Sequence, residues 1–315
     1  MIEVIGPGFL SIIVDCGRQG HGYIGVPSSR ELDRLACAMA RHLVDIPGDA
    51  PLLEVMGNDL RLRFLQEMTF AITGAKVKAT LDEEPLHPWS AIHAGKGTVL
   101  KVAEVLEGLR YYIGFSGIVD VEPVMGSCTT NLECTFGGFH GRPLMKGDRI
   151  ALRDIREPAE FAIVPDRMIP SMREPHLIRV IAGPEVGYFA PASVRFFGNR
   201  KEAALFNATS RLNRTGIRLE GNPLEFRNDV EQSIISEGLL PGTIQVPPDG
   251  CPIIGLAERT IGGYARLATV ADVDMDRLAQ IKPRDSVILS SIDIDEAERL
   301  WRARRDALSF YCKKQ

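Results

Sequence analysis

Apolar residues in this chain gather into short runs that recur about every ten residues and end at glycine or proline. Short runs of this kind predict β-strands rather than helices. The predicted strands are Ile2–Ile5, Phe9–Val14, Leu60–Phe64, Met68–Ile72, Val77–Leu81, Thr98–Val102, Arg110–Phe115, Arg149–Leu152, Phe161–Val164, Leu177–Ile181, Phe206–Arg218, Leu224–Phe226 and Ser286–Ser290. Such spacing is typical of all-β barrels or sandwiches.

Two stretches follow helical spacing instead. In the first, Ser28-Ser29 can cap a helix that has Glu31 in its first turn and an apolar stripe from Leu32 to Leu43. In the second, Asp293 or Asp295 can cap a final helix. The first helix interrupts the β pattern of the first half, and the second follows the last predicted strand.

One hairpin stands out in the second half. Two apolar runs, Thr243–Val246 and Pro252–Leu256, flank Pro247-Pro248-Asp249-Gly250, a sequence suited to a tight turn. The chain then reaches Glu258 to Tyr264, where charges, a hydroxyl and the Gly262-Gly263 pair crowd together. Glycines at a strand end either admit a ligand close to the backbone or only turn a barrel corner.

A proline-rich stretch of mixed charge, Arg156–Pro175, divides the chain. It predicts the last strand of one domain followed by a linker. We therefore expect a domain at residues 1–165, a second at residues 175–292 and a C-terminal helix at residues 293–315. The two halves carry similar numbers of strands, which makes two related β-domains plausible.

Composition limits the possible functions. The 315 residues are 45% hydrophobic and 25% charged, as in ordinary globular proteins. A net charge of -4 gives no reason to expect nucleic acid as a partner. No apolar run has the length of a membrane helix, and the N-terminus lacks the basic start of a signal peptide. The six cysteines include no CxxC pair and the histidines show no ligand spacing, so we expect free thiols, no metal and a cytoplasmic protein.

Two clusters in the first half combine glycine with charge or amide groups. The first, Asp15–His21, is followed by Asp33 near the first helix, and its Arg18 can hold a carboxylate or phosphate. The alternative is that Asp15 and Arg18 pair with each other. The second cluster, Gly126–Asn131, leads to Arg142. Its polar side chains either orient an amide group or bond to their own turns.

Two further clusters lie in the second half. Asn213-Arg214 precedes Gly216 and Arg218 and either aims a guanidinium from a strand or forms a solvated surface. The other cluster is the hairpin region, with Gln245, Asp249, Glu258 and Tyr264. The sequence has no GxSxG, P-loop or HExxH motif. Cys128 or Cys134 with His140 suggests a thiol nucleophile only weakly, because free cysteines usually act as small buried residues.

The four clusters together resemble the biotin-dependent carboxyltransferase family that includes allophanate hydrolase subunit 2, KipA and the C subunit of 5-oxoprolinase. The matching positions keep the family's order over nearly the whole chain. They are Ile2-Glu3-Val4, Pro7-Gly8, Asp15, Gly17-Arg18, Gly20, Gly25-Val26-Pro27, Asp33, Leu53-Glu54, Ile72–Ala75, Gly126-Ser127, Thr130, Phe136-Gly137-Gly138, Gly141–Leu144, Gly147-Asp148, Arg214, Gly216, Arg218-Leu219, Gly221, Ile244–Gly250, Pro252-Ile253-Ile254 and Gly262-Gly263-Tyr264.

The resemblance implies two cyclophilin-like β-barrel domains with a few short helices. It also implies a heteromeric enzyme formed with a KipI-like protein, equivalent to the B-type 5-oxoprolinase subunit, and in the 5-oxoprolinase case with an A-type subunit as well. The substrate would be a small amide, lactam or urea-like molecule. ATP would be used by the complex to open 5-oxoproline to glutamate. In the alternatives, biotin serves a urea carboxylase-type carboxyl transfer, or the chain is a non-catalytic KipA-like regulatory binding protein.

Site residues follow from the same resemblance. The predicted catalytic acids are Asp33, Asp249 and Glu258. The predicted substrate-binding residues are Arg18, Thr130, Asn131, Arg142, Asn213, Arg214, Gln245, Gly262, Gly263 and Tyr264. Charge on an amide oxygen would be stabilised by arginines and amide donors of this set.

The chain departs from the family pattern at several of these positions. Asn131 and Asn213 stand where relatives commonly have aspartate, and Cys128 replaces an arginine. The approach to Gly262-Gly263-Tyr264 is one residue shorter than usual. Asparagine supplies a donor that aspartate lacks, so these exchanges bear on the chemistry more than on the fold.

Overall fold

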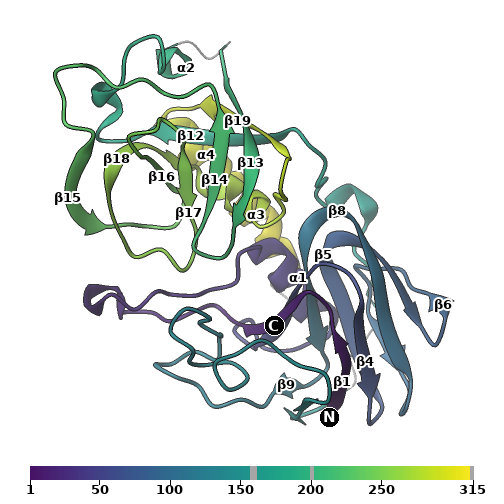
Figure 1. The fold of residues 1–315 in the computed structure, drawn as a ribbon. Helices are drawn as coiled ribbons and strands as arrows, with labels where there is room; N and C mark the ends of the chain where they lie inside the picture. Colours follow the sequence, from purple (N-terminus) through teal and green to yellow (C-terminus); the bar gives the residue numbers. More distant parts are fainter. Residues whose placement is uncertain (157–161, 199–201, 313–315) are drawn as a thin grey trace. The chain divides into compact units, whose positions relative to one another are not determined.

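The computed structural model describes residues 1–156, 162–198 and 202–312 and is mainly β, as predicted (Figure 1). The chain divides into two units. Unit 1 consists of Met1–Gly20 and Ser29–Met172, and unit 2 of His21–Ser28 and Arg173–Gln315. Unit 1 contains a half-barrel sheet and unit 2 a closed barrel. The segment at residues 21–28, which sequence analysis assigned to the first domain, thus groups with unit 2.

The main sheet of unit 1 has the order β10-β1-β4-β8-β3-β2, with β5 on β8 and the short β6 and β7 on β5. Strands β11 and β9 form a separate two-stranded sheet. The strands are β1 (Ile2–Pro7), β2 (Leu10–Val14), β3 (Leu52–Met56), β4 (Leu60–Phe64), β5 (Met68–Leu81), β6 (Glu84–Pro85), β7 (Ile92–Ala94), β8 (Val99–Phe115), β9 (Ile118–Val119), β10 (Arg149–Ile150) and β11 (Leu152–Arg153).

Two long strands, β5 and β8, replace four predicted short ones. Gly74 in β5 and Gly108 in β8 have positive φ values of 88° and 82°, and the β5–β8 register shifts next to Gly74. Glycine accepts this backbone conformation, so it bends a strand through a bulge without ending it. The breaks in the apolar pattern at these positions predict strand ends, and for β5 and β8 this prediction is wrong.

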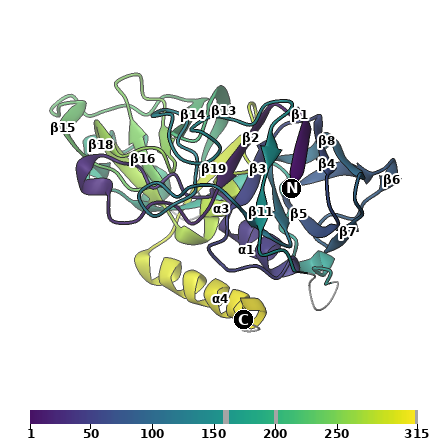
Figure 2. The ribbon, with the colours of Figure 1, turned by 90° about the horizontal axis from the view of Figure 1, so that it is seen from below.

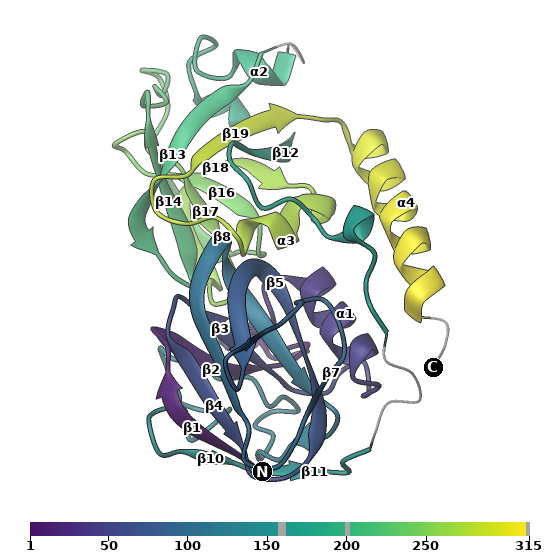
Figure 3. The same cartoon turned by 90° about the vertical axis from the view of Figure 1, so that its right-hand side faces the viewer.

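Helix α1 (Arg34–Leu43) covers part of this sheet (Figure 3). The Thr73 hydroxyl of β5 donates to the Ala36 carbonyl at 2.7 Å. Residues 68–75 of β5 are consequently buried on both faces, whereas β4 alternates buried and exposed positions. Burial on both faces explains why this part of β5 contains no charged residue and shows no alternation of buried and exposed positions.

The N-terminus of α1 differs from the prediction. Asp33 is the N-cap, and its carboxylate accepts from the Ala36 N–H at 2.9 Å. Ser29 instead has a left-handed φ of 51° and is fully buried, and its hydroxyl and carbonyl accept from Asn131 and Thr129. A serine held in this way cannot cap, so the helix begins after Asp33.

In unit 2 the sheet order is β12-β19-β13-β14-β17-β16-β18-β15, and an added β12–β18 pairing closes seven of these strands into a barrel. Only β15 of this described sheet lies outside the ring. The strands are β12 (His176–Ala182), β13 (Ala204–Leu212), β14 (Gly216–Gly221), β15 (Ser233–Gly238), β16 (Thr243–Val246), β17 (Ile253–Gly255), β18 (Ile261–Val270) and β19 (Ser286–Ser291). Buried and less buried residues alternate along β12, β14 and β19, as barrel walls require.

The predicted hairpin and final helix are confirmed. Strands β16 and β17 pair antiparallel with Ile244 opposite Ile254, and Gly250 in their turn has a φ of 75°. Helix α4 (Ile294–Cys312) is capped by Asp293, whose carboxylate accepts from the Glu296 N–H at 2.8 Å. It runs as one long helix (Figure 2). No helix in the described part of the chain is long and apolar enough to cross a membrane.

The remaining helical elements are single turns, namely η1 (Gly22–Ile24), η2 (Asp166–Met168), η3 (Val186–Tyr188), α2 (Arg195–Gly198), η4 (Asp272–Asp274) and α3 (Met275–Leu278). The predicted strand at Leu224–Phe226 amounts to an isolated bridge between Phe189 and Phe226. Phe161, the start of another predicted strand, lies outside the described residues.

Replacing Gly74 tests the bend in β5. A Cβ added there would lie 2.7 Å from the Arg110 carbonyl oxygen, whereas one added at Gly97, which has a φ of 93°, would meet nothing within 4 Å. We expect Gly97→Ala to lower the free energy of unfolding by about 1–2 kcal/mol through backbone strain alone. Gly74→Ala should lower the free energy of unfolding by ~1–3 kcal/mol more than Gly97→Ala does, because the added Cβ overpacks this region. Urea denaturation measures both, and equal losses would contradict the close approach.

Candidate functional site

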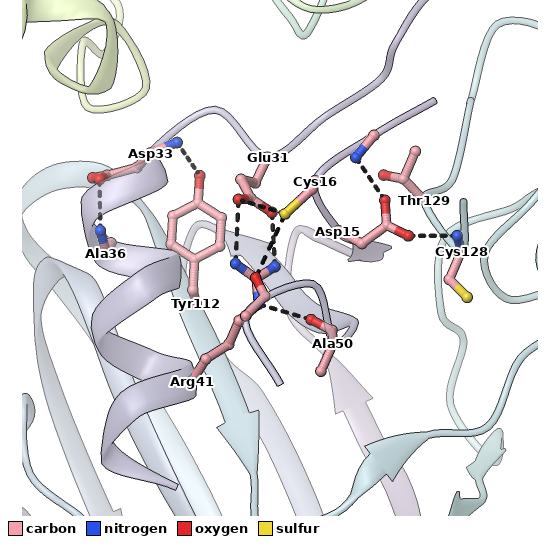
Figure 4. Close-up of polar contacts among 12 residues, drawn as sticks. Asp15, Cys16, Glu31, Asp33, Ala36, Arg41, Ala50, Tyr112, Cys128 and Thr129 are labelled. Carbon is pink, nitrogen blue, oxygen red and sulfur yellow. Dashed lines mark hydrogen bonds and ion pairs between the residues drawn. The ribbon is translucent and has the colours of Figure 1, made fainter. Parts of the chain in front are cut away.

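The carboxylate of Asp15 organises the loop that contains the second predicted cluster (Figure 4). It accepts from the Gly17 N–H at 2.8 Å, the Ser127 hydroxyl at 2.5 Å and the Cys128 N–H at 2.5 Å. The Asp15 carbonyl also accepts from the Glu31 N–H at 2.9 Å. A buried carboxylate with three donors is fully engaged, so Asp15 holds this loop in place.

Arg18 serves the same loop. Its guanidinium donates to the Val124 carbonyl at 3.1 Å and to the Thr129 carbonyl at 2.7 Å. It also lies 4.4 Å above the centre of the Phe136 ring. With 3% of its surface exposed, Arg18 is a buried tether for backbone carbonyls as well as a candidate anion binder.

Thr130 and Asn131, predicted to bind substrate, also have protein partners. The Thr130 hydroxyl donates to the Ile13 carbonyl at 3.0 Å. The Asn131 side chain donates to the Ser29 hydroxyl at 3.1 Å and accepts from the Cys134 N–H at 2.7 Å. The amide group of asparagine uses both donor and acceptor here, which aspartate could not do. This departure from the family pattern therefore has a structural role.

A buried ion pair that sequence analysis missed lies beside Asp15. Arg41 and Glu31 meet through two hydrogen bonds, of 2.8 and 3.2 Å, and Arg41 also donates to the Ala50 carbonyl at 2.8 Å (Figure 4). Glu31 also accepts from the Cys16 thiol at 3.8 Å. Sequence spacing gives no signal for this pair, because Glu31 precedes the helix that carries Arg41.

Asp33 and Arg142 complete the predicted residues of unit 1. Besides capping α1, Asp33 donates its backbone N–H to the Tyr112 hydroxyl at 3.1 Å. Arg142 forms a two-pronged ion pair with Asp148, at 2.7 and 2.9 Å, and stands over the Phe139 ring. The Arg142 hydrogen bond lowers the pKa of Asp148. Arg142 thus holds together the partly exposed turn between itself and Asp148.

Unit 2 brings several predicted residues onto neighbouring strands. Arg214, just before β14, pairs with Glu258, just after β17, at 3.3 Å between Nε and Oε1. The Glu258 N–H also donates to the Arg214 carbonyl at 3.1 Å. Only 5% of Arg214 and 7% of Glu258 is exposed. The pair joins an acid and an arginine that sequence analysis proposed separately.

Gln245 and the two glycines lie on the adjoining strands β16 and β18. The Gln245 side-chain amide donates to the Tyr264 carbonyl at 3.0 Å. A Cβ added at Gly262 would approach the Gln245 amide oxygen to 2.3 Å, and one at Gly263 would lie 3.0 Å from the Ser236 hydroxyl. A side chain at position 262 would therefore displace the Gln245 amide from its present position. The contact supports the proximity of these predicted residues.

Asp249 and Asn213 have local roles in turns. Asp249 is exposed, forms an ion pair with Arg218 and accepts from the Cys251 N–H at 3.0 Å. The Asn213 side-chain oxygen accepts from the Thr215 N–H at 2.8 Å and the Gly216 N–H at 3.1 Å. An aspartate oxygen could accept the same two bonds, so Asn213 preserves the turn.

Arg266 is a further residue that sequence analysis missed. On β18, opposite Gln245 of β16, it forms a two-pronged ion pair with Glu185 at 2.6 and 2.7 Å and reaches Glu237 at 2.8 Å. The Arg266 hydrogen bond holds the pKa of Glu185 below its ordinary value. The two acids lie 81 and 29 positions before Arg266, so only the fold reveals this group.

The cysteines do not favour a thiol nucleophile. Burial raises the pKa of Cys16 to about 11 and also raises the pKa values of Cys37 and Cys128. Cys16 and Cys128 both line a cavity of about 470 Å³ in unit 1, together with Asp15, Asp49 and Arg153. Within the described residues no group of three or more His, Cys, Asp or Glu side chains could hold a metal ion.

The model of the carboxyltransferase domain, subdomains A and B, matches residues 24–291. The chain belongs to this family. The carboxyltransferase-domain chain is 33% identical to the C subunit of 5-oxoprolinase from Escherichia coli K12, over 99% of its own length and 96% of that protein.

Two solved structures share its fold. The Kluyveromyces lactis urea carboxylase has a TM-score of 0.90 and 25% identity, and the alignment covers 98% of this chain and 29% of that one. The crystal structure of TTHA0988 has a TM-score of 0.80 and 30% identity, with coverage of 92% and 55%. The chain thus spans under a third of the first protein and about half of the second. The predicted family resemblance is confirmed.

Substitution at Asp33 separates its cap role from the predicted catalytic role. Asp33→Ala removes the acceptor for the Ala36 N–H and should lower the free energy of unfolding by about 1 kcal/mol, whereas Asp33→Asn should retain the cap. Urea denaturation measures both. If capping is the role that matters, Asp33→Asn keeps the wild-type activity. A folded but inactive Asn variant would support the catalytic role instead.

Thiol labelling tests the burial of the cysteines. At pH 8, iodoacetamide should modify the exposed Cys134 before Cys16, Cys37 and Cys128. A pKa near 11 leaves only about one Cys16 thiol in a thousand ionised at this pH, and the thiolate is the reactive form. Mass spectrometry of timed, quenched digests measures the order. If Cys128 is labelled as fast as Cys134, the predicted order is wrong and Cys128 is a reactive thiol.

Proposed function

We propose that this chain is part of a heteromeric enzyme of the 5-oxoprolinase type, which uses ATP to open the lactam of 5-oxoproline to glutamate. The observation that carries this proposal is the match to the C subunit of 5-oxoprolinase, which covers nearly the full length of both proteins. The urea carboxylase shares the fold but is several times longer.

The buried Arg214–Glu258 pair is the part of the site that we assign to the substrate amide. A lactam presents a carbonyl oxygen next to an N–H group. A guanidinium beside a carboxylate presents the matching donor and acceptor, and both charges are held in a largely water-free position. In this proposal water attacks the lactam carbonyl carbon and Arg214 binds the developing oxyanion. Glu258 takes a proton from the attacking water and gives it to the ring nitrogen as the C–N bond breaks.

ATP is assigned to the complex and not to this chain alone. The arginines of the predicted site already bind protein groups: Arg18 the loop carbonyls, Arg142 the Asp148 carboxylate and Arg214 the Glu258 carboxylate. A triphosphate needs several available cationic or N–H donors. These three arginines therefore offer a poor fit, and the KipI-like B-type partner, with an A-type protein, would supply that binding.

A biotin-dependent carboxyltransferase is the second candidate. The family model and the TM-score of 0.90 to urea carboxylase favour it. In that case the same Arg214–Glu258 pair would orient a urea group, which also presents a carbonyl beside N–H. A KipA-like regulatory binding protein remains the third alternative, distinguished by the absence of turnover in the assembled complex.

Glu258→Gln in the reconstituted complex tests the proposal. The substitution keeps the shape of the side chain but removes its charge and its capacity as a base, and we expect kcat for ATP-dependent glutamate formation to fall by about 100-fold or more. Asp274→Asn is the matched control. Asp274 is also buried in unit 2 and pairs with Arg179 at 2.7 Å, and neither residue belongs to the proposed site.

The control should leave kcat within about threefold of wild type, and thermal melts should show that both variants are folded. Unchanged kcat in Glu258→Gln would remove this residue from the mechanism. A wild-type complex that forms no glutamate, but carboxylates urea when given carboxybiotin, would replace the leading proposal with the second.

A further inference from the structure

The hairpin loop between β13 and β14 carries Arg214 in a backbone conformation that needs support. The Asn213 N–H donates to the Gly216 carbonyl at 3.2 Å, and Arg214 and Thr215 form the two-residue loop between them. Two-residue hairpin loops favour turns with a positive φ at the first loop residue, because such turns match the twist of the strands. Neither Arg214 nor Thr215 has a positive φ. The strands alone therefore do not hold this loop in its preferred form.

The Asn213 side chain supplies the missing support. Its oxygen accepts from the Thr215 N–H at 2.8 Å and from the Gly216 N–H at 3.1 Å. In a closed β-turn, the N–H of the fourth residue donates to the backbone carbonyl of the first. The Asn213 side-chain oxygen takes the place of that carbonyl, as in an Asx-turn. One side-chain oxygen thus fixes the backbone that carries Arg214.

The same loop is joined to the segment that carries Glu258. The Leu256 N–H donates to the Thr215 carbonyl at 2.9 Å. The Glu258 N–H donates to the Arg214 carbonyl at 3.1 Å, and the two side chains meet at 3.3 Å between Nε and Oε1. Both of these carbonyls belong to the loop that Asn213 holds. A movement of the loop would therefore shift the guanidinium relative to the carboxylate.

We infer that Asn213 is a positioning residue, which acts through Arg214 by holding its guanidinium where the oxyanion develops. This inference rests on the proposed function, because it takes the Arg214–Glu258 pair to bind the substrate amide. A displacement of about 1 Å can lower a rate by about 100-fold, because the stabilising contact is made in the transition state. Asn213 is itself exposed, and its contact with the loop uses only the side-chain oxygen.

The family resemblance predicts a different role for Asn213, namely direct contact with substrate. In that role the amide N–H group would serve as a donor, which an aspartate at this position lacks. In the positioning role an aspartate oxygen would suffice. The variants Asn213→Ala and Asn213→Asp therefore distinguish the two roles.

Steady-state kinetics of the reconstituted complex on 5-oxoproline tests the positioning role. Asn213→Ala removes the acceptor, and we expect kcat to fall by about tenfold or more while KM stays within about threefold. Asn213→Asp should keep kcat within about threefold of wild type. Asn58→Ala is the matched control, since Asn58 is also exposed and accepts from the Val105 N–H at 2.8 Å, in unit 1. This control should leave kcat within about threefold of wild type.

A double-mutant cycle measures whether Asn213 acts through Arg214. In the Arg214→Ala variant the guanidinium is gone, so adding Asn213→Ala should change kcat by less than about twofold. A merely structural role would lower kcat by the same factor with and without Arg214. Thermal melts of each variant report whether it is folded.

Three results would overturn the inference and leave the proposed function intact. They are an unchanged kcat in Asn213→Ala, equal losses in Asn213→Ala and Asn213→Asp, and a loss in Asn213→Ala that persists in full without Arg214. Wild-type kcat in both Arg214→Ala and Glu258→Gln would remove the ion pair from the reaction. A wild-type complex that forms no glutamate would overturn the proposed function and the inference together.

Discussion

Charges buried inside each unit must find partners, and meeting this requirement fixes the loops on which the candidate site is built. Removing a carboxylate or guanidinium from water is costly unless hydrogen bonds replace the hydration. In unit 1, the Asp15 carboxylate accepts hydrogen bonds from three donors in two loops. The Arg18 guanidinium donates to two carbonyls and lies over an aromatic ring. In unit 2, Arg214 and Glu258 form an ion pair with each other. The strands supply the frame, and these contacts hold the irregular segments against it.

This constraint changes the meaning of the polar residues singled out in the sequence. Arg18, Thr130 and Asn131 are engaged with the backbone or with buried side chains, and Asp33 caps a helix. Such residues build the walls of a site and need not touch substrate. Arg214 and Glu258 differ, because a charge pair can exchange part of its mutual hydrogen bonding for an amide group. The exchanges to Asn131 and Asn213 keep the turns intact and so do not argue against activity.

Much of the fold could be predicted from the sequence, since short-range physics determines it. The turn at Asp249-Gly250, the hairpin it joins and the Asp293 cap depend on residues a few positions apart. That the predicted short strands join into β5 and β8 could not be predicted. Glycine at position 74 permits either a strand end or a β-bulge, and only pairing with the neighbouring strand decides between them. The prediction of where α1 starts was wrong for a related reason. Ser29 is held by Thr129 and Asn131, which lie about 100 positions later in the chain.

The sequence by itself determined that the chain is mainly β, where its main turns fall, that it belongs to a carboxyltransferase-type family, and which residue types gather near glycines. These features depend on local backbone preferences and on ordered motifs. The tertiary structure alone decided which charges meet. It paired Arg41 with Glu31, Arg214 with Glu258, and Arg266 with Glu185. It also left β15 at the edge of a closed barrel, since closure is a property of the whole ring of strands.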